Sequence, residues 1–283
     1  KNKDKLGMMT PIVHVIIVSY NGMVHLKKSL PSLVNQAYPN FKIFIADNNS
    51  SDGTGEWLSK YYPEVFHIKQ YANVGMSAMN EVLTWPPKNG VSEKAGYIFV
   101  AGWDVIFEAD CIRNAVEVME GRSDVGVLGF DILGHYEYVD YEELGRSSKD
   151  RDSTIIKETN YVCGAASFYR ASLIMEIGFL DPKYFAYAEE DDLQHRVLSS
   201  GFKAVTINTF CWVDDRKGYF PKFMASYLNI RNIIRYKLKN EGLATGLRKA
   251  LGILIYTTKS SKSDGKGRFY ERMRPFSPLK NFG

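Results

Sequence analysis

The fold is decided by residues 13–54, which read VHVIIVSYNGMVHLKKSLPSLVNQAYPNFKIFIADNNSSDGT. Two short apolar runs, 13–19 and 41–46, flank a segment in which apolar residues recur at helical spacing, 24–36. Pro31 lies inside that segment and should kink or shorten the helix, because proline has no N–H to donate. A strand, a helix and a second strand in this order predict a βαβ unit with parallel strand pairing.

The same alternation continues along the chain. It predicts strands at 66–70, 97–101, 125–130 and 161–169, and helices at 53–62, 75–85, 110–120, 171–177, from about 190, and at 221–239. This order is typical of an α/β domain with a mainly parallel sheet flanked by helices. Residues 134–160 are polar and lack apolar periodicity, so we expect a long loop region able to cover a site.

Composition and charge narrow the functional classes. The chain has 283 residues, 45% of them hydrophobic and 24% charged, which is enough for one large α/β domain and an appendage. Its net charge of +4 is mild, so we expect no nucleic-acid partner. Three widely spaced cysteines, Cys111, Cys163 and Cys211, fit a reducing, cytoplasmic setting better than a disulfide framework. No apolar run reaches 18 residues, and no Walker loop or nucleophile elbow occurs.

Polar residues follow each predicted strand of the first half. In open α/β sheets the ligand lies beyond the carboxyl ends of the strands. We therefore expect one rim of the sheet to collect the polar residues Ser19, Tyr20, Asn21, Asp47, Asn48, Asn49 and Asp104.

Three short segments on this rim allow more than one interpretation. In DNNSSDGT (47–54), a carboxylate at a strand end can accept from a base N–H or a ribose hydroxyl, but turn and helix-cap residues have the same composition. In NVGMSAMN (73–80), Gly75 permits a close ligand approach, and a simple helix start explains it equally well. In AGWDV (101–105), Asp104 could face a divalent ion, since magnesium uses as few as one protein carboxylate.

The acidic run in AYAEEDDLQHR (186–196) is the most informative segment. Clustered carboxylates raise one another's proton affinity, which suits a general base near neutral pH. Acids at a helix N-terminus are also common, because they interact favourably with the helix dipole. Charge density alone leaves these two interpretations balanced.

Taken in order, these segments resemble family 2 glycosyltransferases of the GT-A fold, particularly the rhamnosyltransferase-like members, from about residue 13 to 240. The resemblance implies that Ser19, Tyr20, Asn21, Asp47, Asn73, Gly75, Asn80 and Trp103 line a nucleotide site, with Asp47 on a uracil or thymine ring. The family's Asp-x-Asp metal motif falls on Gly102, Trp103 and Asp104, so one acid survives. The segment beneath the donor sugar corresponds to Cys163, Gly164 and Ala165.

The family's Glu-Asp-x-Asp motif falls on residues 189–192. The resemblance therefore implies that Glu190 is the catalytic base, with Asp191 in reserve and Glu189 and Asp192 supporting the donor or acceptor sugar. Many relatives carry a metal-binding His after the next strand, where this chain has Asp214 as a substitute. The implied cofactor is Mg²⁺ or Mn²⁺, held by Asp104.

The implied function is inverting transfer of a sugar from a dTDP- or UDP-linked donor to a hydroxyl of a glycan or lipid-linked acceptor, in cell-surface polysaccharide synthesis. The alternative is a degenerate, non-catalytic GT-A domain of a larger protein, favoured by Gly102 and the absent His and opposed by Glu190 and Asp104. A nucleotidyltransferase would need a glycine-rich basic loop that VSYNGMVHL (18–26) lacks.

The C-terminal segment is strongly basic. We expect one domain over residues 1–240 and a helical basic extension over 241–283. From residue 245 onward, nine Lys and Arg are opposed by Asp264 and Glu271 alone. Its apolar residues, Leu247, Leu251, Ile253 and Leu254, either place a helix on an anionic membrane surface, making the protein peripheral, or pack against the domain.

Overall fold

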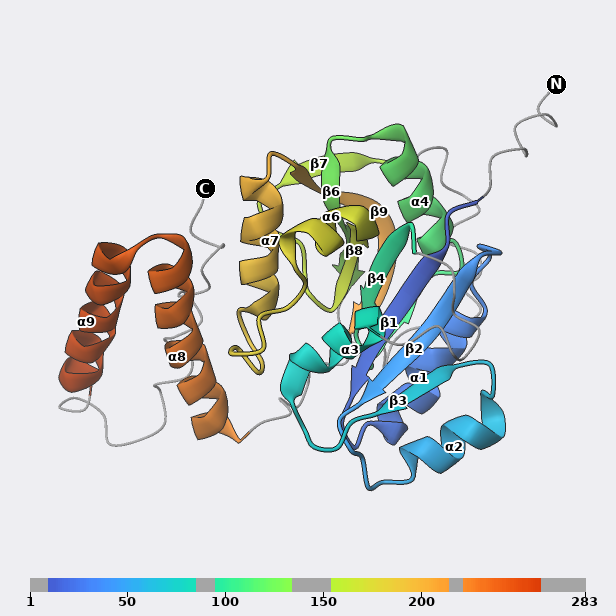
Figure 1. The fold of residues 1–283 in the computed structure, drawn as a ribbon, viewed down its shortest axis with the longest axis horizontal. Helices are drawn as coiled ribbons and strands as arrows, with labels where there is room; N and C mark the ends of the chain where they lie inside the picture. The colour runs from blue at the N-terminus through green and yellow to red at the C-terminus, as the bar shows by residue number, and fades with distance from the viewer. Residues whose placement is uncertain (1–9, 85–94, 134–153, 214–220, 261–283) are drawn as a thin grey trace.

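The computed structural model describes residues 10–84, 95–133, 154–213 and 221–260 (Figure 1). In chain order its elements are β1 (Val13–Ser19), α1 (Met23–Val34), β2 (Phe41–Asp47), α2 (Thr54–Tyr61), β3 (Phe66–Lys69), the 3₁₀ helix η1 (Gly75–Ala78), α3 (Met79–Thr84), β4 (Tyr97–Ala101), β5 (Val105–Phe107), α4 (Cys111–Gly121), β6 (Val125–Leu133), β7 (Ile156–Thr159), β8 (Ala166–Arg170), α6 (Ala171–Ile177), α7 (Glu189–Ser199), β9 (Lys203–Val213), α8 (Lys222–Asn240) and α9 (Leu243–Ser260). The predicted alternation of strands and helices is confirmed through α4.

Within the described residues the strands form one mixed sheet in the order β3-β2-β1-β4-β8-β6-β9-β5, with β7 paired to β9. Strands β1 to β4 are parallel, in a register that sets Ser19 beside Asp47. Strand β8 runs antiparallel to both β4 and β6, and Ala101 pairs with Ala166. The chain entering β8 therefore lies at the same rim where β1, β2 and β4 end. The predicted α/β fold, with a sheet whose first half is parallel and flanked by helices, is confirmed.

Two apolar layers hold helices on the two faces of the sheet. Side chains such as Val15 and Phe99 pack with Leu30 of α1 and Ile112 of α4 on one face. On the other face, the buried side chains of α3, α6 and α7, such as Met79, Leu173 and Leu193, pack together with Ile16 and Val100. Because both faces are covered, the polar residues at the strand ends are left at the rim.

Four strands differ from the expectation: β5, β7 and β9 were not predicted, and β8 begins at Ala166, later than the predicted start at 161. Strand β5 follows Asp104 directly, and β7 occupies part of the predicted loop at 134–160. Ile156, Lys157 and Glu158 of β7 are exposed, so this edge strand has no apolar alternation to reveal it. It forms because β9 offers a free edge for antiparallel pairing. Helix α1 includes Pro31 in its last turns and ends at Val34, slightly earlier than expected.

Helices α8 and α9 form a hairpin beside α7 at the edge of the domain (Figure 1). Gly246 of α9 lies so close to Leu238 of α8 that an added Cβ would come within 2.3 Å of its Cδ2 atom. The predicted domain boundary at 240 coincides with the turn between these helices, and a division into separate domains stays a prediction. Among the described helices, none combines the length and apolar character needed to cross a bilayer.

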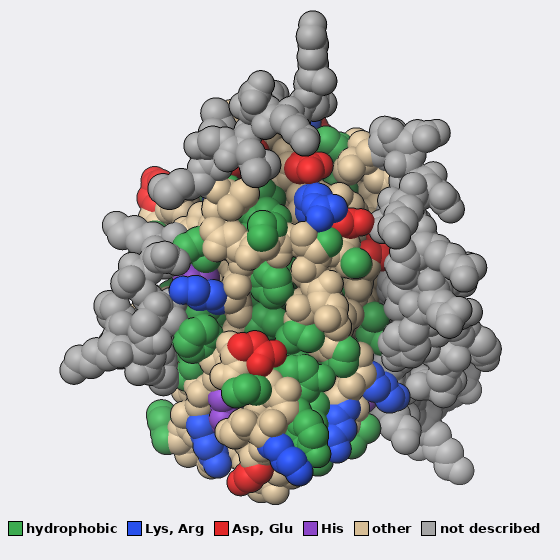
Figure 2. Space-filling model, turned by 90° about the vertical axis from the view of Figure 1, so that its right-hand side faces the viewer, with side chains coloured by type: hydrophobic (Ala, Val, Ile, Leu, Met, Phe, Trp, Pro, Cys, Tyr) green, Lys and Arg blue, Asp and Glu red, His purple; other side chains and the backbone are tan. Residues whose placement is uncertain are grey.

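Basic side chains are dispersed on the face of the molecule that lies at the right-hand side of Figure 1. Figure 2 shows Lys and Arg lying apart, among acidic and apolar side chains, over the described part of that face. This mixed surface agrees with the mild net charge of +4.

Candidate active site

A cavity of about 800 Å³ opens at the rim where the parallel strands end. This volume is within the range of pockets that bind small ligands and cofactors. Many of the residues singled out in the sequence line it: Tyr20, Asn21, Asn73, Gly75, Trp103, Asp104, Cys163, Gly164, Ala165, Glu189 and Glu190. Others singled out lie beyond the lining: Ser19, Asp47, Asn80, Asp191 and Asp192. Asp214 lies outside the described residues.

Asp47 lies behind the cavity wall, where local groups occupy its carboxylate. Its Oδ2 is 2.9 Å from His67 Nε2, and its Oδ1 accepts from the Ser50 backbone N–H at 2.9 Å. Burial raises the pKa of Asp47, but the hydrogen bonds from His67 and Ser50 outweigh it and hold the pKa below its ordinary value. Asp47 is therefore charged at neutral pH and fixes the loop that follows β2.

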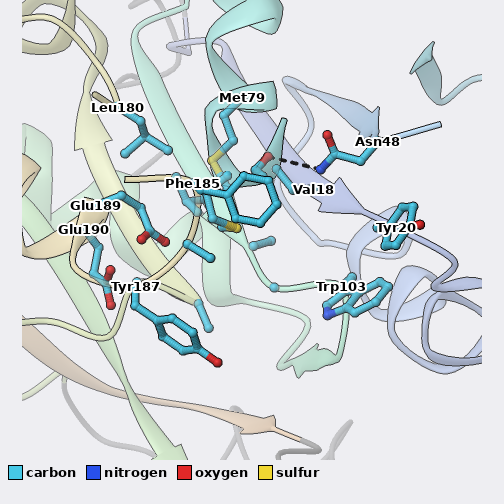
Figure 3. A pocket seen from close by; sticks show the side chains of 18 of the residues that line it. Val18, Tyr20, Asn48, Met79, Trp103, Leu180, Phe185, Tyr187, Glu189 and Glu190 are labelled. Atoms are coloured by element: carbon cyan, nitrogen blue, oxygen red, sulfur yellow. Dashed lines mark hydrogen bonds between the residues drawn. The ribbon is translucent and has the colours of Figure 1, made fainter. Parts of the chain in front are cut away.

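Asn48, which the sequence analysis noted at the rim without assigning it a role, contacts the cavity in place of Asp47. Its Oδ1 accepts from Val74 N at 3.0 Å, and its Nδ2 donates to Gly75 O at 3.1 Å (Figure 3). These bonds join the end of β2 to the start of η1. The position of Asn48 directly after Asp47 indicated that it lies at the rim. The sequence did not indicate that its partner is the segment 26 residues further along the chain.

Gly75 is required by its surroundings. Its φ is +69°, and an added Cβ would lie 2.0 Å from the carbonyl oxygen of Phe185. The next residue, Met76, donates its N–H to that oxygen at 2.7 Å. The predicted close approach at Gly75 is thus made by the chain itself, by the segment that precedes the acidic run.

Asn80 supports the wall from behind. Its Nδ2 donates to Leu180 O at 2.8 Å, and its Oδ1 accepts from Leu180 N at 3.1 Å. Both ends of the amide are therefore engaged by the backbone of a residue that lines the cavity. This geometry gives Asn80 an indirect place at the site, rather than the direct contact implied by the resemblance.

Trp103 and Asp104 occupy the wall opposite the acidic run. The Trp103 ring lies against Gly22, where an added Cβ would be 1.8 Å from its Cε3 atom. At Gly102, an added Cβ would lie 2.6 Å from Val105 Cγ2 and 3.1 Å from Asp104 Oδ1. A side chain at 102 would therefore crowd the side chains of Val105 and Asp104.

On this wall, Asp104 can supply one ligand to a divalent ion, and the other ligands would have to come from phosphate oxygens or water. Asp104 is 6% exposed at the cavity surface. Over the described ranges, no three His, Cys, Asp or Glu side chains gather closely enough to form a metal cage. Asp104 together with phosphate oxygens and water is a ligand set that Mg²⁺ accepts.

The acidic run begins α7 after an unusual turn. Phe185, Tyr187 and Ala188 have positive φ angles of 66°, 70° and 66°. Such angles are costly for residues with a Cβ, and they cluster at functional sites. The turn aims Glu189 and Glu190 into the cavity, on the side opposite Tyr20 and Trp103 (Figure 3).

Glu189 is buried, Glu190 is half-buried, and both are sparsely hydrogen-bonded. Within the described residues, the Oε2 atom of each has no hydrogen-bond partner. Tyr161 Oη donates to Glu190 Oε1 at 3.4 Å, and Gly164 lies so close that an added Cβ would meet Glu190 Cγ at 2.8 Å. Burial raises the pKa of both carboxyls, and repulsion from Glu190 adds to the rise at Glu189. A carboxyl with a raised pKa and a free oxygen can accept a proton from a ligand hydroxyl.

Asp192 points the other way, toward α8. Its oxygens accept from Lys239 Nζ at 2.9 Å, from Asn240 Nδ2 at 3.0 Å and from Arg196 Nε at 3.1 Å. Burial raises its pKa, but these donors outweigh burial and lower it. Asp192 therefore joins α7 to α8, and the sugar contact implied for it by the resemblance does not fit this position.

Comparison with known proteins shows which family this chain belongs to. A model described as glycosyl transferase family 2 matches residues 14–178. The N-acetylglucosaminyl-diphospho-decaprenol L-rhamnosyltransferase of Mycobacterium tuberculosis is 23% identical over 234 residues, which cover 70% of this chain and 74% of that protein. Glycosyltransferase GlyA of Streptococcus pneumoniae is 25% identical over 215 residues, 69% of this chain and 29% of GlyA.

Two solved structures share the fold. S. aureus TarS 1-349 in complex with UDP-GlcNAc has a TM-score of 0.59 at 16% identity, covering 86% of this chain and 71% of that chain. The mannosyltransferase PcManGT from Pyrobaculum calidifontis, in complex with GDP-Man and Mn²⁺, has a TM-score of 0.59 at 18% identity, covering 96% and 70%.

Proposed function

Because this chain belongs to glycosyl transferase family 2, an inverting family that uses nucleotide sugars, we propose that it moves a sugar from a dTDP- or UDP-linked donor to a hydroxyl of a glycan or lipid-linked acceptor. The relative named N-acetylglucosaminyl-diphospho-decaprenol L-rhamnosyltransferase supports a lipid-linked acceptor. A place in cell-surface polysaccharide synthesis is part of the same proposal. The observation that carries the proposal is the buried Oε2 of Glu190, which has no hydrogen-bond partner among the described residues and belongs to a side chain that lines a cavity large enough for a nucleotide sugar.

The nucleotide lies, in this proposal, between the loops that end β1 and β2. Tyr20 is 47% exposed and offers a ring face to a base, while Asn21, Asn48 and Asn73 supply amides around it. Asp47 contributes by holding the 47–50 loop in the conformation that presents Asn48. The donor sugar lies above Cys163, Gly164 and Ala165, between Asp104 and Glu190.

Glu190 acts as the general base. Its carboxylate takes the proton from the acceptor hydroxyl while that oxygen forms a bond to the anomeric carbon. The bond from this carbon to the nucleoside diphosphate breaks on the opposite face, so the configuration inverts. Asp191 lies outside the cavity lining, so Glu190 is preferred to it, and Glu189 lies beside Glu190 where it contacts the sugar.

A divalent ion, Mg²⁺ or Mn²⁺, is the proposed cofactor, and Asp104 is the side chain that would hold it with the donor phosphates. When bound, such an ion neutralises the charge that develops on the leaving diphosphate. PcManGT, which shares the fold, was solved with Mn²⁺.

The decisive experiment is a donor-hydrolysis and transfer assay over dTDP-, UDP- and GDP-sugars, with Mg²⁺, with Mn²⁺ and with a chelator. We expect turnover with one dTDP- or UDP-sugar, lost on chelation and in Asp104→Asn. Absence of turnover with every donor, together with retained nucleotide binding, would support the alternative of a non-catalytic domain.

Helix α9 supports a peripheral membrane location in the same proposal. Leu243, Leu247 and Leu251 form one exposed stripe, each with more than half of its surface accessible. Gly246 packs against Leu238 of α8 and Ile253 is buried, whereas the three leucines of the stripe remain exposed. Flotation with anionic liposomes should retain the full chain and release a variant with Leu243, Leu247 and Leu251 changed to Ser, whereas neutral liposomes should bind neither.

A further inference from the structure

The position of Glu190 in the cavity wall depends on the backbone conformation of residues 185–188, which these residues do not favour. Three of the four residues 185–188 have positive φ without being glycine, and α7 begins at the next residue. Each such residue is less stable than it would be in ordinary backbone, because its Cβ crowds the following carbonyl oxygen. If this 185–188 turn relaxed, the first turn of α7 would rotate and carry Glu190 away from the cavity. Something outside the turn must hold it.

Asn232 of α8 provides that hold. It is 0% exposed, and its Nδ2 lies 2.9 Å from Tyr184 O, 2.7 Å from Ala186 O and 2.7 Å from Tyr187 O. The amide is oriented by Arg231, whose Nε donates to Asn232 Oδ1 at 2.8 Å. Because that bond fixes the oxygen, the NH₂ group must face the turn.

Two other groups complete the set of donors. Arg231 Nη2 donates to Tyr184 O at 2.6 Å and to Lys183 O at 3.2 Å. From the opposite side, Met76 N donates to Phe185 O at 2.7 Å. Every carbonyl from 183 to 187 is thereby satisfied, by α8 on one side and by η1 on the other.

We propose that Asn232 is a positioning residue for catalysis: by holding the 185–188 turn in its left-handed conformation, it keeps Glu190 aimed at the acceptor hydroxyl. This rests on the proposed function of Glu190. Asn232 lies beyond residue 178, where the match to the family ends.

The side chain at 232 must be a neutral amide. An aspartate would place negative oxygens against three carbonyl oxygens. A leucine would leave Ala186 O and Tyr187 O without their donor, while Tyr184 O would keep Arg231. Docking of α8 itself does not depend on Asn232, since Lys239 and Asn240 bind Asp192 about two turns further along the same helix. A positioning role and a merely structural role can therefore be separated.

The test compares Asn232→Ala with Asn229→Ala in the full chain. Asn229 lies one turn earlier on α8, is exposed, and bonds within its own helix, to Ala225 O. We expect Asn232→Ala to lower kcat by about 100-fold, the loss typical of a misplaced catalytic group, while the Kd for the donor nucleotide changes less than about twofold. Asn229→Ala should leave both unchanged. A retained kcat in Asn232→Ala overturns the proposal.

A rescue variant addresses the conformation directly. Ala188 is not in the cavity lining, and glycine removes the cost of its positive φ. Ala188→Gly alone should leave kcat unchanged, and in the Asn232→Ala background it should restore kcat by about fivefold or more. A structural defect of α8 would show no such rescue, and that result also counts against the proposal.

Hydrogen exchange separates this inference from the proposed function. Amides of residues 183–190 should exchange faster in Asn232→Ala and remain protected in Asn229→Ala, whether or not a donor is turned over. Unchanged protection in Asn232→Ala would show that Asn232 does not stabilise the 185–188 turn. If Asn232→Ala does not fold, Arg231→Met serves in its place, because Arg231 is only partly buried; it should show the same directions with smaller changes.

Discussion

Glu190 and Asp192 lie two residues apart on the first turn of α7, and they have opposite electrostatic properties. The cavity face, with Glu189 and Glu190, has buried oxygens without hydrogen-bond partners in the described structure, and burial raises the pKa of its carboxyls. The α8 face has Asp192, which is fully buried and has four donors and a lowered pKa.

The difference shows that partners, rather than residue type or burial, decide the role of each acid. Burial penalises the charged form on both faces. Lys239 and Arg196 repay that penalty at Asp192, so its charge stabilises the contact with α8. At Glu190 the penalty stands, and the carboxyl is left able to exchange a proton with a ligand. Variants that change the cavity face or the α8 face alone test this difference.

The largest expected effect comes from Glu190→Gln. Loss of a general base typically lowers turnover by roughly 100- to 10,000-fold, and the uncharged amide keeps the shape of the cavity. Transfer assays should show this loss in kcat, with donor Kd unchanged by calorimetry. Asp192→Asn is the matched control and should keep most of its kcat. Full activity in Glu190→Gln would remove the catalytic role from the cavity face.

Gly164→Ala should displace Glu190 without changing its chemistry. The added methyl would lie 2.8 Å from Glu190 Cγ and 2.9 Å from its Cβ, so the side chain must move. A displacement of about 1 Å typically costs about 100-fold in rate. Gly121→Ala is the control, because an added Cβ there meets nothing within 4 Å. Equal activities of the two variants would contradict the close approach.

Asp192→Asn should affect stability instead of chemistry. Removing one partner of a buried charge pair typically costs about 3–5 kcal/mol, and we expect about 3 because Lys239 is partly exposed. At roughly 2–4 °C per kcal/mol, Tm should fall by about 6 °C or more. Asp124→Asn, in a surface ion pair, should leave Tm nearly unchanged. Because the folded pKa of Asp192 is lowered, its contribution is present above its ordinary pKa and is lost as the pH falls through the lowered value.

The smallest effect is a gain in stability from Glu189→Gln. The folded pKa of Glu189 is raised, so the buried carboxyl favours folding when protonated and opposes it as the pH rises above its ordinary pKa. The variant should match the parent at about pH 3.5, below the ordinary pKa of 4.5, and exceed it by on the order of 1 kcal/mol at pH 8. Urea unfolding at both pH values measures this, with exposed Glu176→Gln as control. A gain that shrinks with rising pH would contradict the raised pKa.

Much of the fold could be read from local pattern. The alternation of strands and helices through α4 follows from hydrophobic periodicity, and the polar residues after β1, β2 and β4 meet at one rim because parallel strands end together. Strand β7 could not be read, because its exposed residues carry no alternation and its pairing depends on β9, some 45 residues away.

The sequence by itself determined which acids start α7 and in what order they come, since both follow from neighbouring residues. Only the tertiary structure decided that Glu190 faces the cavity while Asp192 faces α8. It also decided that Asn232 binds the 185–188 turn that precedes both acids. Asn232 is 45 residues from Tyr187, so no local pattern could pair them. Local preference sets the elements, but the environment of each charge is made by segments that are distant in the chain and become neighbours on folding.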